Sequence, residues 1–256
     1  MGAAVGLVMG LSGAGGGILA LPSLVYSQGW SMQQAMPVAL LAVTCGALAG
    51  ALEGWRKKLV RYRAALLMAA AGALPTVFGV RLAQHLSQVW LMALFALILL
   101  LVAARLLRHA PVADDGGRAV LARINGDTGR FDWTPRTGAV IAAIGGMAGL
   151  VTGLLGVGGG FVIVPMLRRY TNLSMHGAVA TSLLVIALVG SVGIASALAN
   201  GATLPAGFSL SFVASTVAGM LAGRRIAAYL PARKVQTLFA LLLLAVAASL
   251  LLRLWR

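Results

Sequence analysis

Charged residues are scarce in this chain of 256 residues, at 10% of the total, while apolar residues make up 60%. A soluble domain is about one quarter charged, so the composition excludes an ordinary water-facing surface and fits one that faces lipid. Several apolar runs reach about 20 residues, the length of helix that crosses a hydrocarbon core of about 30 Å. Open sheets are excluded from lipid, and no segment alternates like a barrel strand. The sequence therefore predicts an all-α, polytopic membrane protein.

Acidic residues and cysteine are scarcer still, since the chain has five Asp and Glu and one cysteine. Cys45 alone excludes an internal disulfide and a multi-cysteine metal site. No carboxylate lies well inside an apolar run, so coupling to sodium or protons through an intramembrane acid has no candidate, and cation transport is disfavoured. The sequence also lacks a Walker loop, an HExxH motif, a His/Asp cluster and a Ser-His-Asp set. It thus predicts no enzyme activity, no cofactor and no metal site.

Basic residues are the exception to this shortage of charge, because 20 Lys and Arg give a net charge of +15. They stand mainly at the ends of apolar runs, which is typical of cytoplasmic anchoring beside lipid and not of nucleic-acid binding. The expected partners are the lipid bilayer and a small anionic substrate, with no nucleic acid. The sequence leaves open whether the protein forms a homo-oligomer. We expect a multi-pass location in a bacterial inner membrane.

The chain contains an internal repeat. Residues 6–41 align with residues 149–184 at a constant offset of 143, and 16 of these 36 pairs are identical. The repeat predicts two homologous halves, residues 1–107 and 137–256, joined by a polar cytoplasmic linker at 108–136. The identical pairs include three consecutive glycines, a proline and a Ser-Met pair, namely Gly15–Gly17 with Gly158–Gly160, Pro22 with Pro165, and Ser31-Met32 with Ser174-Met175.

Each half is predicted to contain one glycine-broken helical segment followed by three unbroken helices. If every segment spans the membrane, the repeats are parallel and Lys and Arg divide 13 to 7 between the two sides. If each broken segment is a re-entrant hairpin, the repeats are inverted and the division is 17 to 3. The preference of basic residues for the cytoplasm favours inverted repeats with hairpins, although residues 137–155 are long enough to span. The predicted segments are 2–27, 33–54, 62–84 and 89–107, then 137–170, 175–199, 205–229 and 233–252.

The strongest functional signal is the glycine turn that breaks the first segment of each half. Glycine costs a helix roughly 1 kcal/mol per residue relative to Ala, so a triple glycine that occurs twice calls for a reason. The half-helix after each turn presents free N–H groups and the positive end of its dipole, which bind anions without a charged side chain. Close helix packing is the alternative, and it explains Gly6, Gly10, Gly149 and Gly153 better than it explains the triple glycines.

Other candidate residues lie near these turns. Pro22 and Pro165 follow the turns and either free a backbone carbonyl or simply kink the half-helix. Thr181 and Ser182 replace apolar residues of the first half and either donate to an anion or bond back to their own helix. The full set of candidate substrate-binding residues is Gly13, Gly15, Gly16, Gly17, Gly156, Gly158, Gly159, Gly160, Pro22, Pro165, Thr181 and Ser182.

The repeated motif resembles a known family. The pattern G-L-x-x-G-L-x-G-x-G-G-G, followed by apolar residues and a proline, occurs at residues 6–17 and 149–160. It resembles the sulfite exporter TauE/SafE family over almost the whole chain outside the linker. The resemblance implies a permease, with members linked to export of sulfite, sulfoacetate and related sulfur-containing organic anions, and it leaves the substrate unfixed. Only 12 residues precede Gly13, so either the first helix is short or the sequence begins inside it.

Two functions of different classes follow from these features. The first is a permease that exports a small anion, sulfite or an organosulfonate, through a midplane site between the two glycine turns. It predicts a polar cavity at the midplane that solvent can reach. The second is a membrane scaffold or assembly protein that transports nothing. It predicts tightly packed glycines without a cavity.

Overall fold

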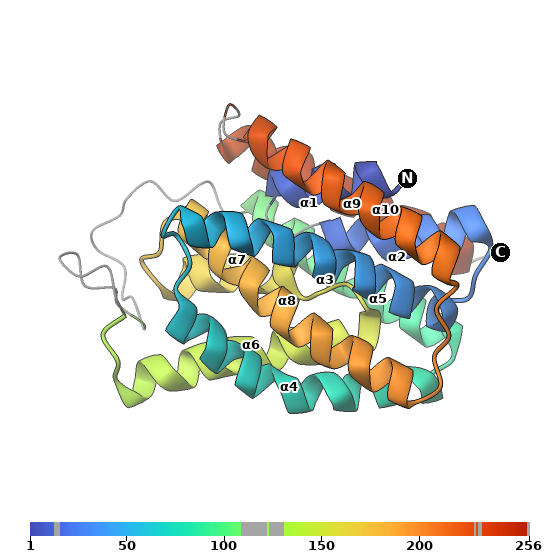
Figure 1. Cartoon of the computed structure of the whole chain (residues 1–256), viewed down its shortest axis with the longest axis horizontal. Coiled ribbons are helices and arrows are strands. Elements are labelled where there is room, and N and C mark those ends of the chain that lie inside the picture. Colours follow the sequence, from blue (N-terminus) through green and yellow to red (C-terminus); the bar gives the residue numbers. More distant parts are fainter. Residues whose placement is uncertain (13–15, 109–121, 123–130, 228, 230–231, 255–256) are drawn as a thin grey trace.

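The protein is all-helical over the residues that the computed structural model describes, which are 1–12, 16–108, 122, 131–227, 229 and 232–254. Figure 1 shows the helices lying along a common long axis. Their bounds are α1 Gly2–Ser12, α2 Gly16–Gln28, α3 Met32–Arg56, α4 Tyr62–His85, α5 Gln88–Arg108, α6 Pro135–Leu155, α7 Gly160–Tyr170, α8 Met175–Ala199, α9 Ala206–Ala227 and α10 Ala232–Leu254.

The helix ends follow local chemistry that the repeat duplicates. Ser31 caps α3, where it accepts a hydrogen bond from the Gln34 N–H in a capping box. Ser174, its counterpart in the second half, caps α8 by accepting a hydrogen bond from the Gly177 N–H. The predicted break in the second half is confirmed, because α6 ends at Leu155 before α7 begins at Gly160. The predicted break in the first half falls on residues 13–15, which lie outside the described residues. The duplicated Ser-Met pair therefore marks equivalent helix starts.

Five helices are long and apolar enough to cross a membrane, namely α3, α4, α6, α8 and α9. The described apolar parts of α5 and α10 are shorter. Large apolar side chains also face outward, including Leu74 at 81% and Leu210 at 72% exposure. Exposure of that size is costly in water and ordinary in lipid. The chain is therefore a multi-pass α-helical membrane protein, as its sequence predicts.

The packing of the helices follows the repeat. α4 lies alongside α6, and α1 lies alongside α9, on opposite sides of the molecule (Figure 1). Gly149 of α6 touches the backbone of Gly72, and its counterpart Gly6 of α1 touches the backbone of Thr216. The two contacts are related by the sequence offset between the halves. In both pairs an absent side chain lets two backbones meet, as small residues do in membrane helix interfaces.

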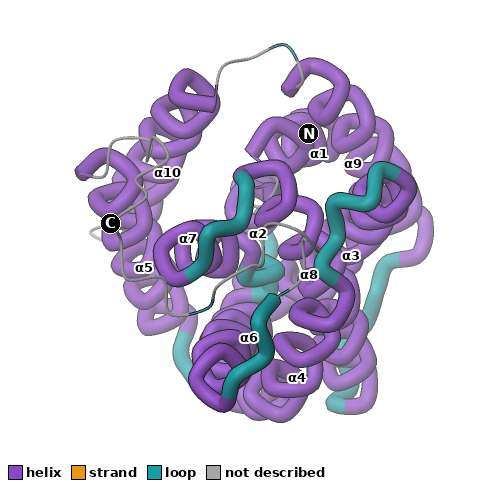
Figure 2. The backbone as a smooth tube through the Cα atoms, turned by 90° about the vertical axis from the view of Figure 1, so that its left-hand side faces the viewer, coloured by secondary structure: helices purple, strands orange, loops and turns teal. Residues whose placement is uncertain are grey.

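The central helices α3 and α8 are equivalent in the repeat and run antiparallel. Gly54, near the end of α3, lies against Ala180, near the start of α8, while Thr44 lies against Gly190 further along α8. Equivalent helices that cross a bilayer in opposite directions belong to inverted halves. This arrangement supports the predicted inverted repeat. α5 and α10, the last helices of the two halves, pack against each other at one side (Figure 2).

The second broken segment returns to the end at which it starts. α6 and α8 both run parallel to α4, so the chain between them must come back, and α7 makes that return. Ala122 of the linker donates its N–H to the carbonyl of Tyr170, the last residue of α7. We call this end of the molecule the linker end. The contacts that set the directions are Gly145 with Met68, Gly153 with Thr76, Val189 with Gly72 and Gly193 with Thr76.

This topology predicts the sides of the membrane on which the termini and the linker lie. The hairpin topology assigns 17 of the 20 Lys and Arg to the side of the linker, which we therefore expect to be cytoplasmic. A reporter fused after Arg256 should be periplasmic, and one inserted within residues 113–130 should be cytoplasmic. Paired fusions to alkaline phosphatase and to a fluorescent protein measure this. A periplasmic linker or a cytoplasmic C-terminus would contradict the hairpin topology.

Candidate functional site

The glycine turn of the second half has a backbone that other residues adopt only at a cost. Gly156, Gly158 and Gly159 have φ angles of 64°, 81° and 55°, in the left-handed region that favours glycine. Gly156 is the C-cap residue of α6, and Gly159 is the N-cap residue of α7, which has no side-chain hydrogen bond to cap it. The turn is buried. The N-terminus of α7 is thus an uncapped helix end inside the protein, where it carries a partial positive charge.

The two glycine turns meet near the middle of the bundle. Gly158 lies against Val43 and Ile186, which stand close to the midpoints of α3 and α8. Gly17, in the first turn of α2, touches the carbonyl of Val157. The structure thus brings Gly16, Gly17 and the residues 156–160 to one place. Gly13 and Gly15 lie outside the described residues, so their positions stay predictions.

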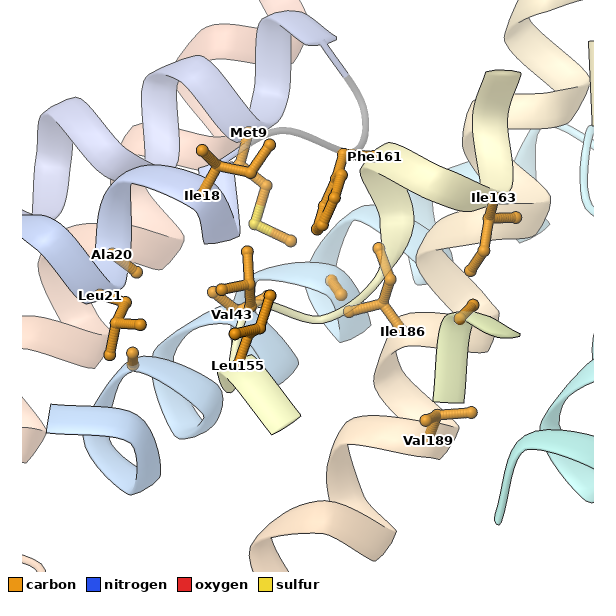
Figure 3. Packing of buried hydrophobic residues seen from close by; sticks show 14 of the residues in the cluster. Met9, Ile18, Ala20, Leu21, Val43, Leu155, Phe161, Ile163, Ile186 and Val189 are labelled. Carbon is orange, nitrogen blue, oxygen red and sulfur yellow. The ribbon is translucent and has the colours of Figure 1, made fainter. Parts of the chain in front are cut away.

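Buried apolar side chains of the core cluster lie around the described parts of the turns (Figure 3). Glycines let the backbones of the two turns approach closely here. The polar cavity at the midplane stays a prediction. The side chains that line this centre are Met9, Ile18, Val43, Leu155, Phe161 and Ile186.

A small cavity lies beside the second turn, displaced toward the end opposite the linker end. Its volume is about 50 Å³, enough for a few water molecules. Gly156 and Gly153 form one wall and Val80 forms another. At its outer end Gln33 donates from Nε2 to the carbonyl of Leu86 at 3.1 Å. The remaining lining residues are Met36, Pro37, Leu40, Ala83, Gln84, Ala197 and Ala202.

The other predicted site residues lie at varying distances from the turns. Pro22 and Pro165 are inside α2 and α7, where each lacks the N–H that would bond the carbonyl four residues earlier. Thr181 accepts a hydrogen bond from the Arg61 N–H at 3.1 Å, toward the linker end. Ser182 donates to the carbonyl of Val179 at 2.8 Å, which is the back-bonding alternative. Both α8 hydroxyls have protein partners in this conformation.

Two polar features were missed or undervalued at the level of sequence. Thr44 has a buried hydroxyl with no hydrogen-bond partner among the described residues, at the point where α3 crosses Gly190 of α8. Arg224 lies in the last turn of α9, where the charge pattern indicated membrane anchoring, yet its side chain is only 12% exposed and turns toward α3. In this later part of the repeat the offset is one residue larger, so that Gly79 matches Gly223 and the counterpart of Arg224 is the apolar Val80. That difference between equivalent positions is the signal that marks Arg224 in the sequence.

Comparison with known proteins decides the family. The family described as "Sulfite exporter TauE/SafE" matches residues 1–250. The chain belongs to the TauE/SafE family. A "Probable membrane transporter protein" of Xylella fastidiosa is 30% identical to it over 99% of this chain and 94% of the relative. This TauE/SafE protein is also 25% identical to YunE of Bacillus subtilis, a "Probable membrane transporter protein", over 78% of this chain and 77% of the relative.

A third relative in the TauE/SafE comparison is longer than this chain. MamO of Magnetospirillum gryphiswaldense is 24% identical over 97% of this chain, which spans 43% of that relative. No solved structure shows a significant match. The family and the relatives' names agree with the helices in one respect, which is that this TauE/SafE protein is a multi-pass membrane transporter.

Proposed function

We propose that this protein exports a small anion, sulfite or an organosulfonate, from the cytoplasm across a bacterial inner membrane. The observation that supports this best is the buried, uncapped N-terminus of α7, which stands on left-handed glycines beside the turn of the other half. Free backbone N–H groups and the helix dipole suit an anion and reject a cation. The family description names sulfite, and its breadth makes related organosulfonates equal candidates.

The apolar packing around the turns fits a conformation in which the anion site is covered. Alternating access between inverted halves opens such a site first to one side of the membrane and then to the other. The cavity beside Gly156 lies toward the end opposite the linker end. A membrane potential that is negative inside favours outward movement of an anion by about 2.3 kcal/mol per charge at 100 mV. Export therefore needs no coupling acid.

Transport by the purified protein is the test of this proposal. Proteoliposomes with a potassium diffusion potential should take up radiolabelled sulfite when their lumen is positive, because the anion moves down the potential. Collapsing the potential should slow uptake strongly, and replacing sodium should leave it unchanged. Taurine-derived sulfonates and simple carboxylates form the comparison panel. A strict sodium requirement would exclude potential-driven transport.

A membrane scaffold is the second candidate, and one observation favours it. The glycine turns touch each other directly, through Gly17 and the carbonyl of Val157, with apolar side chains around them. Such close packing of helices is sufficient for a scaffold. The same liposome experiment separates the two functions, since a scaffold moves none of the tested anions at any potential.

A further inference from the structure

Arg224 joins α9 to α3 at the linker end of the bundle. Its Nε lies 2.8 Å from Oε2 of Glu53, and its Nη1 donates to the carbonyl of Gly50 at 2.8 Å. The other carboxylate oxygen of Glu53 lies 2.6 Å from Nζ of Lys57, which is 60% exposed. Arg224 is therefore the inner partner of Glu53 and Lys57 the outer one. A guanidinium with 12% exposure keeps its place only while a carboxylate and a carbonyl satisfy it.

The position of Arg224 corresponds to a wall of the cavity in the other half. Val80 lines that cavity beside Gly153, and its backbone nitrogen lies 2.9 Å from the place of a methyl group on Gly153. Arg224 has the same relation to Gly10, the counterpart of Gly153. A methyl group added to Gly10 would lie 2.7 Å from the backbone nitrogen of Arg224. If the two halves are related by a two-fold axis, the space equivalent to this cavity lies beside Gly10 at the linker end. The Arg224 side chain enters that space. Among the described residues, this cavity lies toward one end of the bundle, and the ion pair between Arg224 and Glu53 lies toward the other.

We propose that Arg224 binds the transported oxyanion at the linker end, and that the Glu53 carboxylate takes the place of the anion in this conformation. The inference rests on the proposed anion export. Opening the linker end requires α9 to leave α3, and this movement frees the guanidinium from Glu53 and Gly50. A guanidinium presents a planar fork of donors that fits the oxygens of a carboxylate and those of a sulfur oxyanion alike.

A second cation lies at the same end and adds to the attraction. The backbone N–H of Arg61 bonds Thr181 at the start of α8, and the Nε of Arg61 is buried without a hydrogen-bond partner among the described residues. Arg225, the neighbour of Arg224, is exposed on the outer face of α9. It has the same charge at nearly the same height along the helix, so it is a matched control for a general effect of charge.

The experiment measures the sulfite concentration that half-saturates uptake into everted membrane vesicles, which expose the linker end. Arg224→Gln should raise it about tenfold or more, the effect of losing a hydrogen bond to a charged group. The half-saturating concentration of Arg224→Lys should lie between those of the wild type and Arg224→Gln, because lysine keeps the charge and lacks the planar fork of donors. Glu53→Gln should lower the concentration, because the internal competitor is neutralised. Arg225→Gln should stay within about twofold, as expected for an exposed charge.

The outcomes separate this inference from the proposed function. Wild-type vesicles that take up none of the tested anions would refute the proposed function and the inference with it. Uptake by the wild type with equal half-saturation in Arg224→Gln and Arg225→Gln would refute the inference alone. The gain expected for Glu53→Gln guards against misfolding, since a damaged protein does not bind sulfite more tightly. An unchanged or raised half-saturation in a monodisperse Glu53→Gln protein would also overturn the inference.

Discussion

Sulfite transport should fall about tenfold or more when Gly158 is replaced by Ala, while the protein still folds. A methyl group there would lie 2.8 Å from Cγ1 of Val43 and 3.0 Å from Cγ2 of Ile186, and both of these side-chain ends can shift. The φ of 81° costs an alanine roughly 1–2 kcal/mol. If the backbone at residue 158 shifts to relieve the side-chain contacts or the unfavourable φ, its peptide plane rotates. The N–H groups at the start of α7 then point in another direction. Initial uptake rates per amount of monodisperse protein measure the effect.

Gly201 provides the matched control for that substitution. It has a φ of 82° in the loop between α8 and α9, and no atom lies within 4 Å of the place of a methyl group. Gly201→Ala therefore carries the same backbone strain without the neighbours at the centre of the bundle. We expect it to lose a similar amount of stability and to transport at nearly the wild-type rate. Equal transport by the two variants would remove the support for an anion site at the turn.

The course of the helices could be predicted from sequence because its signals are local. The segment expected at 175–199 is α8, Met175–Ala199, since Ser174 caps its start and Asn200 and Gly201 follow its end. The glycine break of the second half was predictable for the same reason. The inverted arrangement was predicted from the side preference of Lys and Arg, a property that acts on each loop separately.

The contents of the site were harder to predict because they depend on distant neighbours. Glycine permits both an anion-binding turn and close helix packing, so the same residues pointed to a cavity and to its absence. Gly17 touches Val157 from the other half, which no local pattern reveals. Arg224 at a helix end is equally suited to lipid headgroups and to an inward ion pair. Only the contact with Glu53 and Gly50 decides between them.

A large loss of folded protein is expected for Gly149→Ala. A methyl group on Gly149 would enter the backbone of Gly72, so α4 and α6 would have to move apart along their shared interface. Overpacking costs roughly 1–3 kcal/mol, and the upper end applies because a backbone neighbour cannot change its rotamer. The same argument applies to Gly6 against Thr216 in the other half. Thermal unfolding in detergent, followed by size-exclusion chromatography, should show a lower midpoint and less monodisperse protein for either variant.

Gly146 separates this packing effect from a general intolerance of the helix to alanine. It lies on α6 three residues before Gly149, and a methyl group there would meet only the carbonyl of Ala71, at an ordinary distance of 3.8 Å. Because Ala is favoured over Gly inside a helix by about 1 kcal/mol, Gly146→Ala should match or exceed the stability of the wild type. If Gly149→Ala is as stable as Gly146→Ala, the close approach of α4 and α6 does not hold the fold together, and the equivalent contact between α1 and α9 loses its significance as well.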